Sequence, residues 1–142
     1  MLGQPGGCKR IYIPHRSEAW APATLVKFSR GKTATVIVDG DNHEPITISL
    51  DEEMAGILRA ATGDDQDNVC SDSVPFPIQS TRLDNDTSVP DMANLEHLHE
   101  PAILHNVRAR FLGQFPYTFS GEICVAVNPY QWLSALYSEV IQ

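Results

Sequence analysis

Residues 33–50 read TATVIVDGDNHEPITISL, and this stretch decides the fold of the first part of the chain. Residues 33–39 are rich in β-branched side chains, which favour extended backbone, and so they predict a strand. A Gly-Asp-Asn turn follows at 40–42. Residues 45–50 then alternate Ile and Leu with Thr and Ser, as a half-buried strand does. The stretch therefore predicts two strands joined by a turn.

Two further strands are predicted upstream. Residues 10–14 (RIYIP) form a short β run that ends in proline, and residues 20–28 follow with bulky apolar side chains. The turn at 29–32 contains Gly31, which tolerates the positive φ of a tight reversal. Four short strands at this spacing indicate a small antiparallel barrel or curled sheet. Residues 51–61 have helical spacing of apolar residues and an acidic first turn, so a helix should follow.

A composition change separates this unit from the rest. The segment 62–89 is rich in Ser, Asn, Pro and Thr and carries −5 of the chain's net charge of −8, through six aspartates and Arg82. Such a segment buries too little apolar surface to offset its ordering entropy, so we expect an acidic disordered linker. A solvated loop is the favoured interpretation, and a phosphorylated or partner-binding loop is the alternative. The acidic residues are Asp64, Asp65, Asp67, Asp72, Asp84 and Asp86.

Helical spacing returns after the linker. Pro90 and Asp91 should open a short helix, with apolar residues three apart up to position 98. A second helix should begin at Glu100-Pro101, because proline suits the first helical turn. The apolar residues expected to form its buried stripe are Ile103, Leu104, Val107 and Phe111.

A hairpin is predicted next. Residues 117–120 (YTFS) and 123–127 (ICVAV) flank a turn at Gly121. The second strand is apolar on both faces, which is typical of a strand inside a large covered sheet. A lone hairpin needs neighbouring strands and covering layers. The segment 90–142 is therefore expected to be part of a larger domain.

The composition excludes several classes of protein. The chain has 142 residues and a net charge of −8, which argues against a nucleic-acid-binding surface. The sequence contains no run of eighteen or more apolar residues, so it predicts no membrane-spanning helix. The first seven residues lack the apolar core of a signal peptide. Cys8, Cys70 and Cys124 are scattered and indicate reduced thiols in a soluble intracellular protein.

Two side-chain groups invite a ligand hypothesis. A cluster after the linker suggests a metal site, but Pro101 separates the helices that carry it, so a solvated surface at the helix junction is favoured. Aromatic residues of the barrel suggest a cage for methylated lysine or a proline-rich ligand, although the core of a small barrel is the favoured interpretation. Cys124 is expected to pack within its strand. The cluster after the linker consists of Glu96, His97, His99, Glu100 and His105. The barrel aromatics are Tyr12, Trp20 and Phe28.

Residues 91–111 read DMANLEHLHEPAILHNVRARF and residues 116–130 read PYTFSGEICVAVNPY. This succession of Glu-Pro, Leu-His-Asn, Arg-x-Arg-Phe, Tyr-Thr-Phe-Ser-Gly and Val-Asn-Pro-Tyr resembles the start of the myosin motor head over some forty residues. The earlier strands (KRIYIPH and WAPATLV) resemble the SH3-like barrel that precedes the motor core in many myosins. The resemblance implies a barrel at 8–61, the linker at 62–89, and an incomplete α/β segment of the P-loop NTPase-type motor core at 90–142.

In that family the loop after this strand contacts the purine of ATP. The resemblance implies that Asn128 hydrogen-bonds the base edge, and that Pro129 and Tyr130 shape the loop. Tyr137 would pack near the base. Two departures stand out: Gln131 replaces the usual Lys, and Tyr137 lies nine residues after Asn128 where eight is more common.

The phosphate-binding part of such a site is missing from the sequence. No Gly-rich loop ending in Gly-Lys-Ser or Gly-Lys-Thr occurs. We therefore expect no catalytic residue and no ligand for Mg²⁺ in this chain, and no ATP hydrolysis or movement of actin by it alone. The complete protein would be an actin-activated ATPase of the cytoplasmic actin cytoskeleton, with actin filaments and the rest of the heavy chain as partners. The alternatives are a stand-alone SH3-like peptide-binding module and a truncated product without activity.

Overall fold

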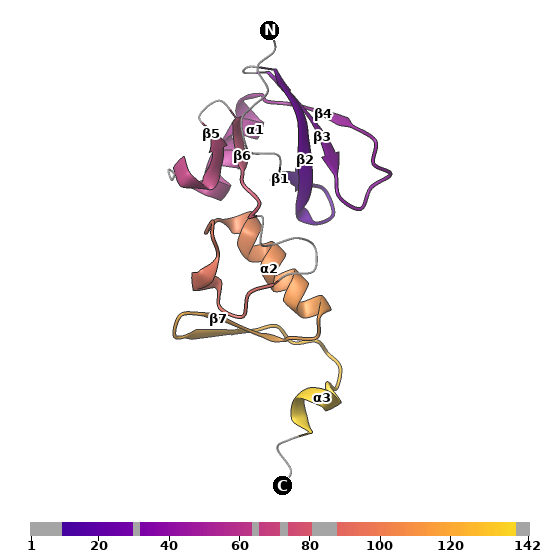
Figure 1. Ribbon diagram of the computed structural model, residues 1–142, viewed down its shortest axis with the longest axis vertical. Coiled ribbons are helices and arrows are strands. Elements are labelled where there is room, and N and C mark those ends of the chain that lie inside the picture. The colour runs from indigo at the N-terminus through magenta and orange to yellow at the C-terminus, as the bar shows by residue number, and fades with distance from the viewer. Residues whose placement is uncertain (1–9, 30–31, 64–65, 72–73, 81–87, 139–142) are drawn as a thin grey trace.

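The computed structural model describes residues 10–29, 32–63, 66–71, 74–80 and 88–138. Figure 1 shows two parts stacked along the long axis of the molecule. A β-rich part with helix α1 (Glu52–Thr62) lies at one end. Helix α2 (Glu100–Leu112) crosses the middle, and a β-hairpin and helix α3 (Ser134–Tyr137) lie at the other end.

The first part is built on a four-stranded antiparallel sheet. Its strands are β1 (Arg10–His15), β2 (Ala19–Ser29), β3 (Thr33–Val38) and β4 (Ile46–Ser49), in the order β1-β2-β3-β4. These are the four strands that the sequence predicts, to within two residues at each end. The alternation of burial along β3 is complete, because every second side chain faces the core. A small β unit is thereby confirmed.

Helix α1 follows the sheet as predicted. Asp51 is its N-cap, and its Oδ1 accepts a hydrogen bond from the Met54 amide at 2.8 Å. Gly63 ends the helix at φ 67°, a left-handed conformation that suits glycine. Leu58 points from α1 into the core. The buried core consists of Ile11, Ile13, Ala21, Ala23, Leu25, Ala34, Val36, Val38, Leu58 and Phe76.

The structure differs from the expected disordered linker over 62–89. Residues 66–68 form a 3-10 turn (Gln66–Asn68), and strands β5 (Val69–Ser71) and β6 (Val74–Pro77) pair antiparallel. Phe76 is fully buried in the core, and Ile78 forms an antiparallel bridge with Ile11.

The reason for this difference is local. The segment contains the apolar run VPFPI at 74–78, in which Phe76 and Pro77 are buried, and burial of these side chains favours an ordered position next to β1. The average composition of the segment is acidic and polar, so it does not reveal this run. The Gln79 amide also donates to the Arg10 carbonyl at 3.1 Å. Of the six aspartates, only Asp67 falls within the described residues.

The second part contains one long helix and one hairpin. The predicted short helix after Asp91 is a single 3-10 turn (Met92–Asn94), whereas α2 begins at Glu100 as predicted. The prediction of its apolar stripe is wrong for Leu104 and Phe111, whereas Ile103 and Val107 are half-buried. The buried residues of α2 are Pro101, Ala102 and Asn106, while Leu104 and Phe111 are exposed. The buried Asn106 side chain forms hydrogen bonds with the backbone of Val89.

The hairpin is confirmed, with β7 (Tyr117–Ser120) antiparallel to β8 (Ile123–Ala126). Gly121 has φ 59° at the turn. The free edge of β7 is occupied by residues 90–91, because the Phe119 amide donates to the Pro90 carbonyl at 2.8 Å and Asp91 bridges Phe119 in parallel. Asp91 Oδ1 also accepts from the amides of Ala93 and Gly121.

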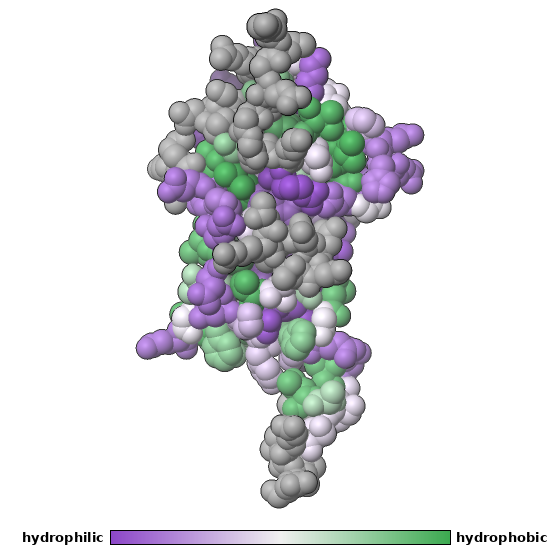
Figure 2. All heavy atoms as spheres, viewed as in Figure 1, coloured by the Kyte–Doolittle hydropathy of each residue, from purple (hydrophilic) through white to green (hydrophobic). Residues whose placement is uncertain are grey.

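The hairpin is poorly covered, as its composition predicts. Ile123 is 68% exposed, and Cys124, expected to pack, is exposed as well. Figure 2 shows hydrophobic residues at the surface over this end of the molecule. The exposed large apolar residues here are Leu112, Phe115, Tyr117, Phe119, Ile123, Tyr130, Trp132 and Leu136. Within the ranges described, no helix has the length and apolarity required to cross a bilayer.

Candidate functional site

The loop after β8 carries the predicted purine-contacting residues. Asn128 Oδ1 accepts a hydrogen bond from the Tyr130 amide at 2.8 Å, which closes a tight Asx turn around Pro129. Tyr130 has φ 51°, in the left-handed region, and its side chain is 92% exposed. The turn therefore presents the phenol ring to solvent.

The remaining predicted residues lie further along. Gln131 is exposed next to Tyr130, and Trp132 is 79% exposed. Leu133 is buried and precedes α3, which ends at Tyr137. The side chain of Tyr137 lies outside the described residues. The structure brings residues 128–131 together in one turn and places position 137 on a separate short helix.

The turn offers one side-chain donor and one aromatic surface. Asn128 Oδ1 is occupied by the Tyr130 amide, so the Asn128 amide group is available to donate to a ring nitrogen acceptor. The exposed Tyr130 ring provides an aromatic surface. Both groups lie on an open surface of the described part of the chain.

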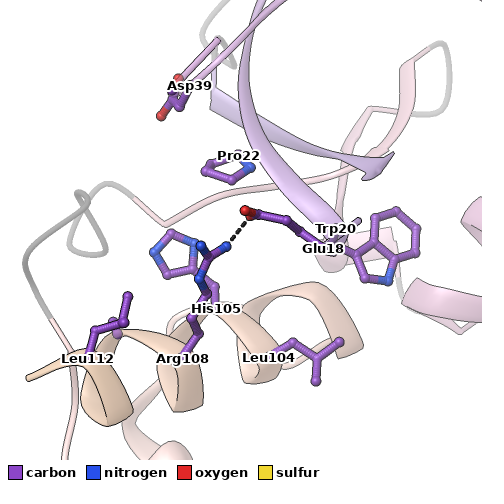
Figure 3. A pocket seen from close by; sticks show the side chains of 10 residues that line it. Glu18, Trp20, Pro22, Asp39, Leu104, His105, Arg108 and Leu112 are labelled. Carbon is purple, nitrogen blue, oxygen red and sulfur yellow. Dashed lines mark hydrogen bonds and ion pairs between the residues drawn. The ribbon is translucent and has the colours of Figure 1, made fainter. Parts of the chain in front are cut away.

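A pocket of about 320 Å³ lies elsewhere, where α2 packs against the β-rich part (Figure 3). Trp20 and Pro22 line it from β2, and Leu104 and Leu112 line it from two ends of α2. The remaining lining residues are Glu18, Asp39, Gly40, His105, Arg108 and Ala109. We call the contacts between β1, β2 and residues 78–80 on one side and residues 98–112 on the other the junction.

Ion pairs neutralise the charged groups of the pocket. Arg108 reaches from α2 to the carboxylate of Glu18, just before β2 (Figure 3). This hydrogen bond lowers the pKa of Glu18 and raises the pKa of Arg108. On the sheet side, Arg10 Nη1 donates to Asp39 Oδ1 at 2.8 Å. The pocket thus offers apolar walls and no uncompensated charge among its described residues.

Trp20 and the histidines hold the junction together. The Trp20 indole Nε1–H donates to Glu100 Oε1 at 3.1 Å, and His99 Nε2 lies 2.8 Å from the Ile78 carbonyl. The Tyr12 ring is fully buried, and the His99 and His105 rings approach it edge-on at 5.8 and 5.6 Å between centroids. Burial raises the pKa of Tyr12 and lowers the pKa of both histidines.

The structure can be compared with the two ligand hypotheses drawn from the sequence, the histidine cluster and the barrel aromatics. The predicted solvated surface is wrong for His99, which is only 3% exposed. Across the described ranges, no group of three or more His, Cys, Asp or Glu side chains is arranged to hold a metal ion. Tyr12 is a core residue, so it is not available to an aromatic cage. This agrees with the favoured interpretation that the barrel aromatics form a core.

The sequence patterns do not identify the residues that make the junction. His99 is polar, and helical periodicity is read from apolar positions alone. The same holds for Asn106, which lies outside the junction and binds Val89. One signal is available: a histidine directly before Glu-Pro stands at the N-cap position, where a side-chain acceptor is needed. Trp20 gives no sequence signal for its partner, because Glu100 is eighty residues away.

The comparison with protein families agrees with the motif. Residues 89–142 match the family model described as myosin head (motor domain). The match begins at Val89, where the Asn106 side chain holds the backbone, and it includes α2, the hairpin and the turn at Asn128. Residues 89–142, somewhat more than a third of the chain, are therefore similar to part of the myosin motor domain.

Proposed function

We propose that this chain contributes the front of an ATP-dependent motor that moves along actin filaments. The observation that carries the proposal is the family match over 89–142, with Val-Asn-Pro-Tyr placed directly after strand β8. The match supports a myosin motor domain, and ATP and actin are the substrate and track that such a domain implies. The complete protein would accordingly work in the cytoplasm on the actin cytoskeleton.

Within that motor, the Asn128 turn would form one wall of the purine site. The Asn128 amide would donate to the base, Pro129 and Tyr130 would hold the shape of the turn, and Gln131 would lie beside it. Tyr137 would approach the base once α3 is fixed by surrounding structure. ATP supplies the free energy of phosphoryl cleavage when it is bound with Mg²⁺. The 142-residue sequence has no phosphate-loop motif, so other parts of the heavy chain would hold the phosphates and the metal ion.

We propose that the β-rich part is an SH3-like domain with a positioning role. It contacts α2 through Trp20, His99 and the Glu18–Arg108 pair. These contacts would fix the start of the motor segment relative to the β sheet. The four-stranded order and the buried core support a small barrel-like unit that extends to about residue 80.

The experiment uses the longest in-frame heavy chain that contains these residues. Asn128→Ala should raise the KM for ATP about tenfold, because one hydrogen bond to a buried base contributes about 1.5 kcal/mol. The actin-activated kcat should change little, since the contact is made equally in the ground state and the transition state. The control is Asn42→Ala, which removes the same amide group from an exposed turn of the β-rich part. An unchanged KM for ATP in Asn128→Ala would exclude the purine contact.

A further inference from the structure

Both ring nitrogens of His99 are engaged in the structure. The Ala102 amide donates to Nδ1 at 3.2 Å, which makes His99 the side-chain N-cap of α2. The other nitrogen, Nε2, lies 2.8 Å from the Ile78 carbonyl. A carbonyl only accepts, so Nε2 must carry the proton, and an amide only donates, so Nδ1 must be bare. One protonation state satisfies both contacts: the neutral ring with its hydrogen on Nε2.

Protonation of Nδ1 is incompatible with this arrangement for three reasons. It removes the acceptor that caps α2. It places a positive charge at the N-terminus of a helix, where the macrodipole is already positive. It also places that charge on a ring that is 3% exposed and packed edge-on against buried Tyr12.

The surroundings of His99 offer little compensation. The groups that face it are the Tyr12 ring on β1, the His97 ring stacked parallel at 6.5 Å, the Ile78 carbonyl and the Ala102 amide. Glu100, next in the chain, is hydrogen-bonded to Trp20. No carboxylate is recorded in contact with the ring in the described part of the chain.

The position of His99 makes its protonation state matter for the whole junction. Ile78 is bridged to Ile11 of β1, so the His99–Ile78 hydrogen bond links the start of α2 directly to the sheet. The second histidine of the junction, His105, packs on the same Tyr12 ring near Arg10, Asp39 and Arg108. Two of these three charged groups are cations, so a charge on His105 would be disfavoured as well.

We propose that the junction is a pH-sensitive contact: protonation of His99 releases the β-rich part from the start of the motor segment. This inference concerns the chain's own conformation and is independent of ATP binding. Because the folded state disfavours the charged ring, the pKa of His99 lies below its ordinary value of 6.5. The contact is therefore complete above pH 6.5 and weakens as the pH falls from 6.5 toward the folded-state pKa, with a limiting slope of about tenfold per pH unit for one proton.

The first test is the tautomer of His99 in the wild-type chain. The ¹⁵N shifts of the imidazole at pH 7.5 should identify Nε2 as protonated and Nδ1 as bare. On acidification, the loss of the bare Nδ1 signal should coincide with the loss of protection of the Ala102 amide from hydrogen exchange. A ring protonated on Nδ1 at pH 7.5 would overturn the proposal without any variant being made.

The second test uses Trp20 as a reporter of the junction. In a Trp132→Phe background Trp20 is the only tryptophan, and its indole is hydrogen-bonded across the junction to Glu100. Its emission should shift to longer wavelength as the pH falls below 6.5, and the midpoint of this shift should coincide with the midpoint of the His99 titration. His99→Asn retains a neutral N-cap but does not titrate, so its emission should be constant over this range.

The control is His43→Gln, which removes an exposed histidine from the turn before β4 and should behave as wild type. A wild-type transition that persists in His99→Asn would assign the effect to another group and overturn the proposal. Titration of His99 without any change in Trp20 emission would overturn it too. Because the readout is Trp20 and not activity, failure here leaves the proposed motor function unaffected.

Discussion

The side-chain amide of Asn106 forms two hydrogen bonds with the backbone of Val89. The Val89 amide donates to Asn106 Oδ1 at 2.8 Å, and Asn106 Nδ2 donates to the Val89 carbonyl at 3.0 Å. Asn106 is fully buried on α2. Its side chain satisfies the backbone N–H and C=O groups of Val89, which would otherwise need another hydrogen-bond partner. The family match begins at Val89, the residue that this pair of hydrogen bonds anchors to α2.

Asn106→Ala should lower the free energy of unfolding by about 1–3 kcal/mol, because two backbone groups of Val89 lose their partners in a half-buried site. Asn106→Asp should be similarly destabilising near pH 7, since a carboxylate accepts from the Val89 amide but cannot donate to its carbonyl. Urea unfolding followed by far-UV circular dichroism measures both. Asn94→Ala, an exposed asparagine in the same part of the chain, is the control. Equal stability of Asn106→Ala and the control would contradict this role.

Phe76 tests whether the acidic segment belongs to the β-rich part. Phe76→Ala should cost about 3–5 kcal/mol of stability, because the ring is fully buried in the core. Phe115→Ala removes an exposed ring that contacts Arg110, so it should cost about 1 kcal/mol or less. Thermal unfolding compares the two. If the variants were equally stable, residues 74–80 would not be part of the fold.

The exposed hairpin should cause self-association. Ile123 is 68% exposed on β8, and unprotected apolar strands pair with other chains. Ile123→Lys should reduce the oligomeric fraction in sedimentation velocity and change the stability by about 0.5 kcal/mol or less. Ser120→Lys adds the same charge to the hairpin without removing an apolar side chain, and it should have the smaller effect. Identical distributions for Ile123→Lys and wild type would exclude β8 as the contact.

Asp91 gives the hairpin an acid-sensitive contact. The amides of Ala93 and Gly121 donate to its carboxylate and hold its pKa below the ordinary value of 3.8. The contribution of Asp91 is therefore present above pH 3.8 and is lost as the pH falls through the folded-state pKa. The ¹⁵N–¹H signal of Gly121 should shift over this range in wild type and not in Asp91→Asn. Asp41→Asn, in an exposed turn, should retain the shift.

The elements with regular side-chain patterns are predictable from the sequence. Strands β1 to β4, α1, α2 and the hairpin follow from alternation, turn glycines and Pro101 at a helix start. The motif that ends at Asn128 and Tyr130 likewise points to the myosin head family, and the family match over 89–142 agrees with it. The strands, helices and turns depend on the conformational preferences of residues that are close in the sequence, so they can be predicted from it.

The tertiary contacts are not predictable in the same way. Phe76 lies in a segment whose average composition is polar, and its burial depends on β1 being available next to it. Likewise, α2 buries Ala102 and Asn106, and Asn106 binds the distant Val89 backbone, whereas its apolar residues Leu104 and Phe111 are exposed. The position of residue 137 relative to the turn at Asn128 also depends on tertiary contacts and not on local preferences.

The most direct test of the motor assignment is to sequence the mature transcript beyond the codon for Gln142. We expect the reading frame to continue within a few dozen codons into a Gly-rich loop that ends in Gly-Lys-Thr or Gly-Lys-Ser. That result would place the Asn128 turn in an ATP site with its phosphate-binding part. A stop codon directly after Gln142 in the abundant transcripts would contradict the proposal that this chain is the front of an active motor.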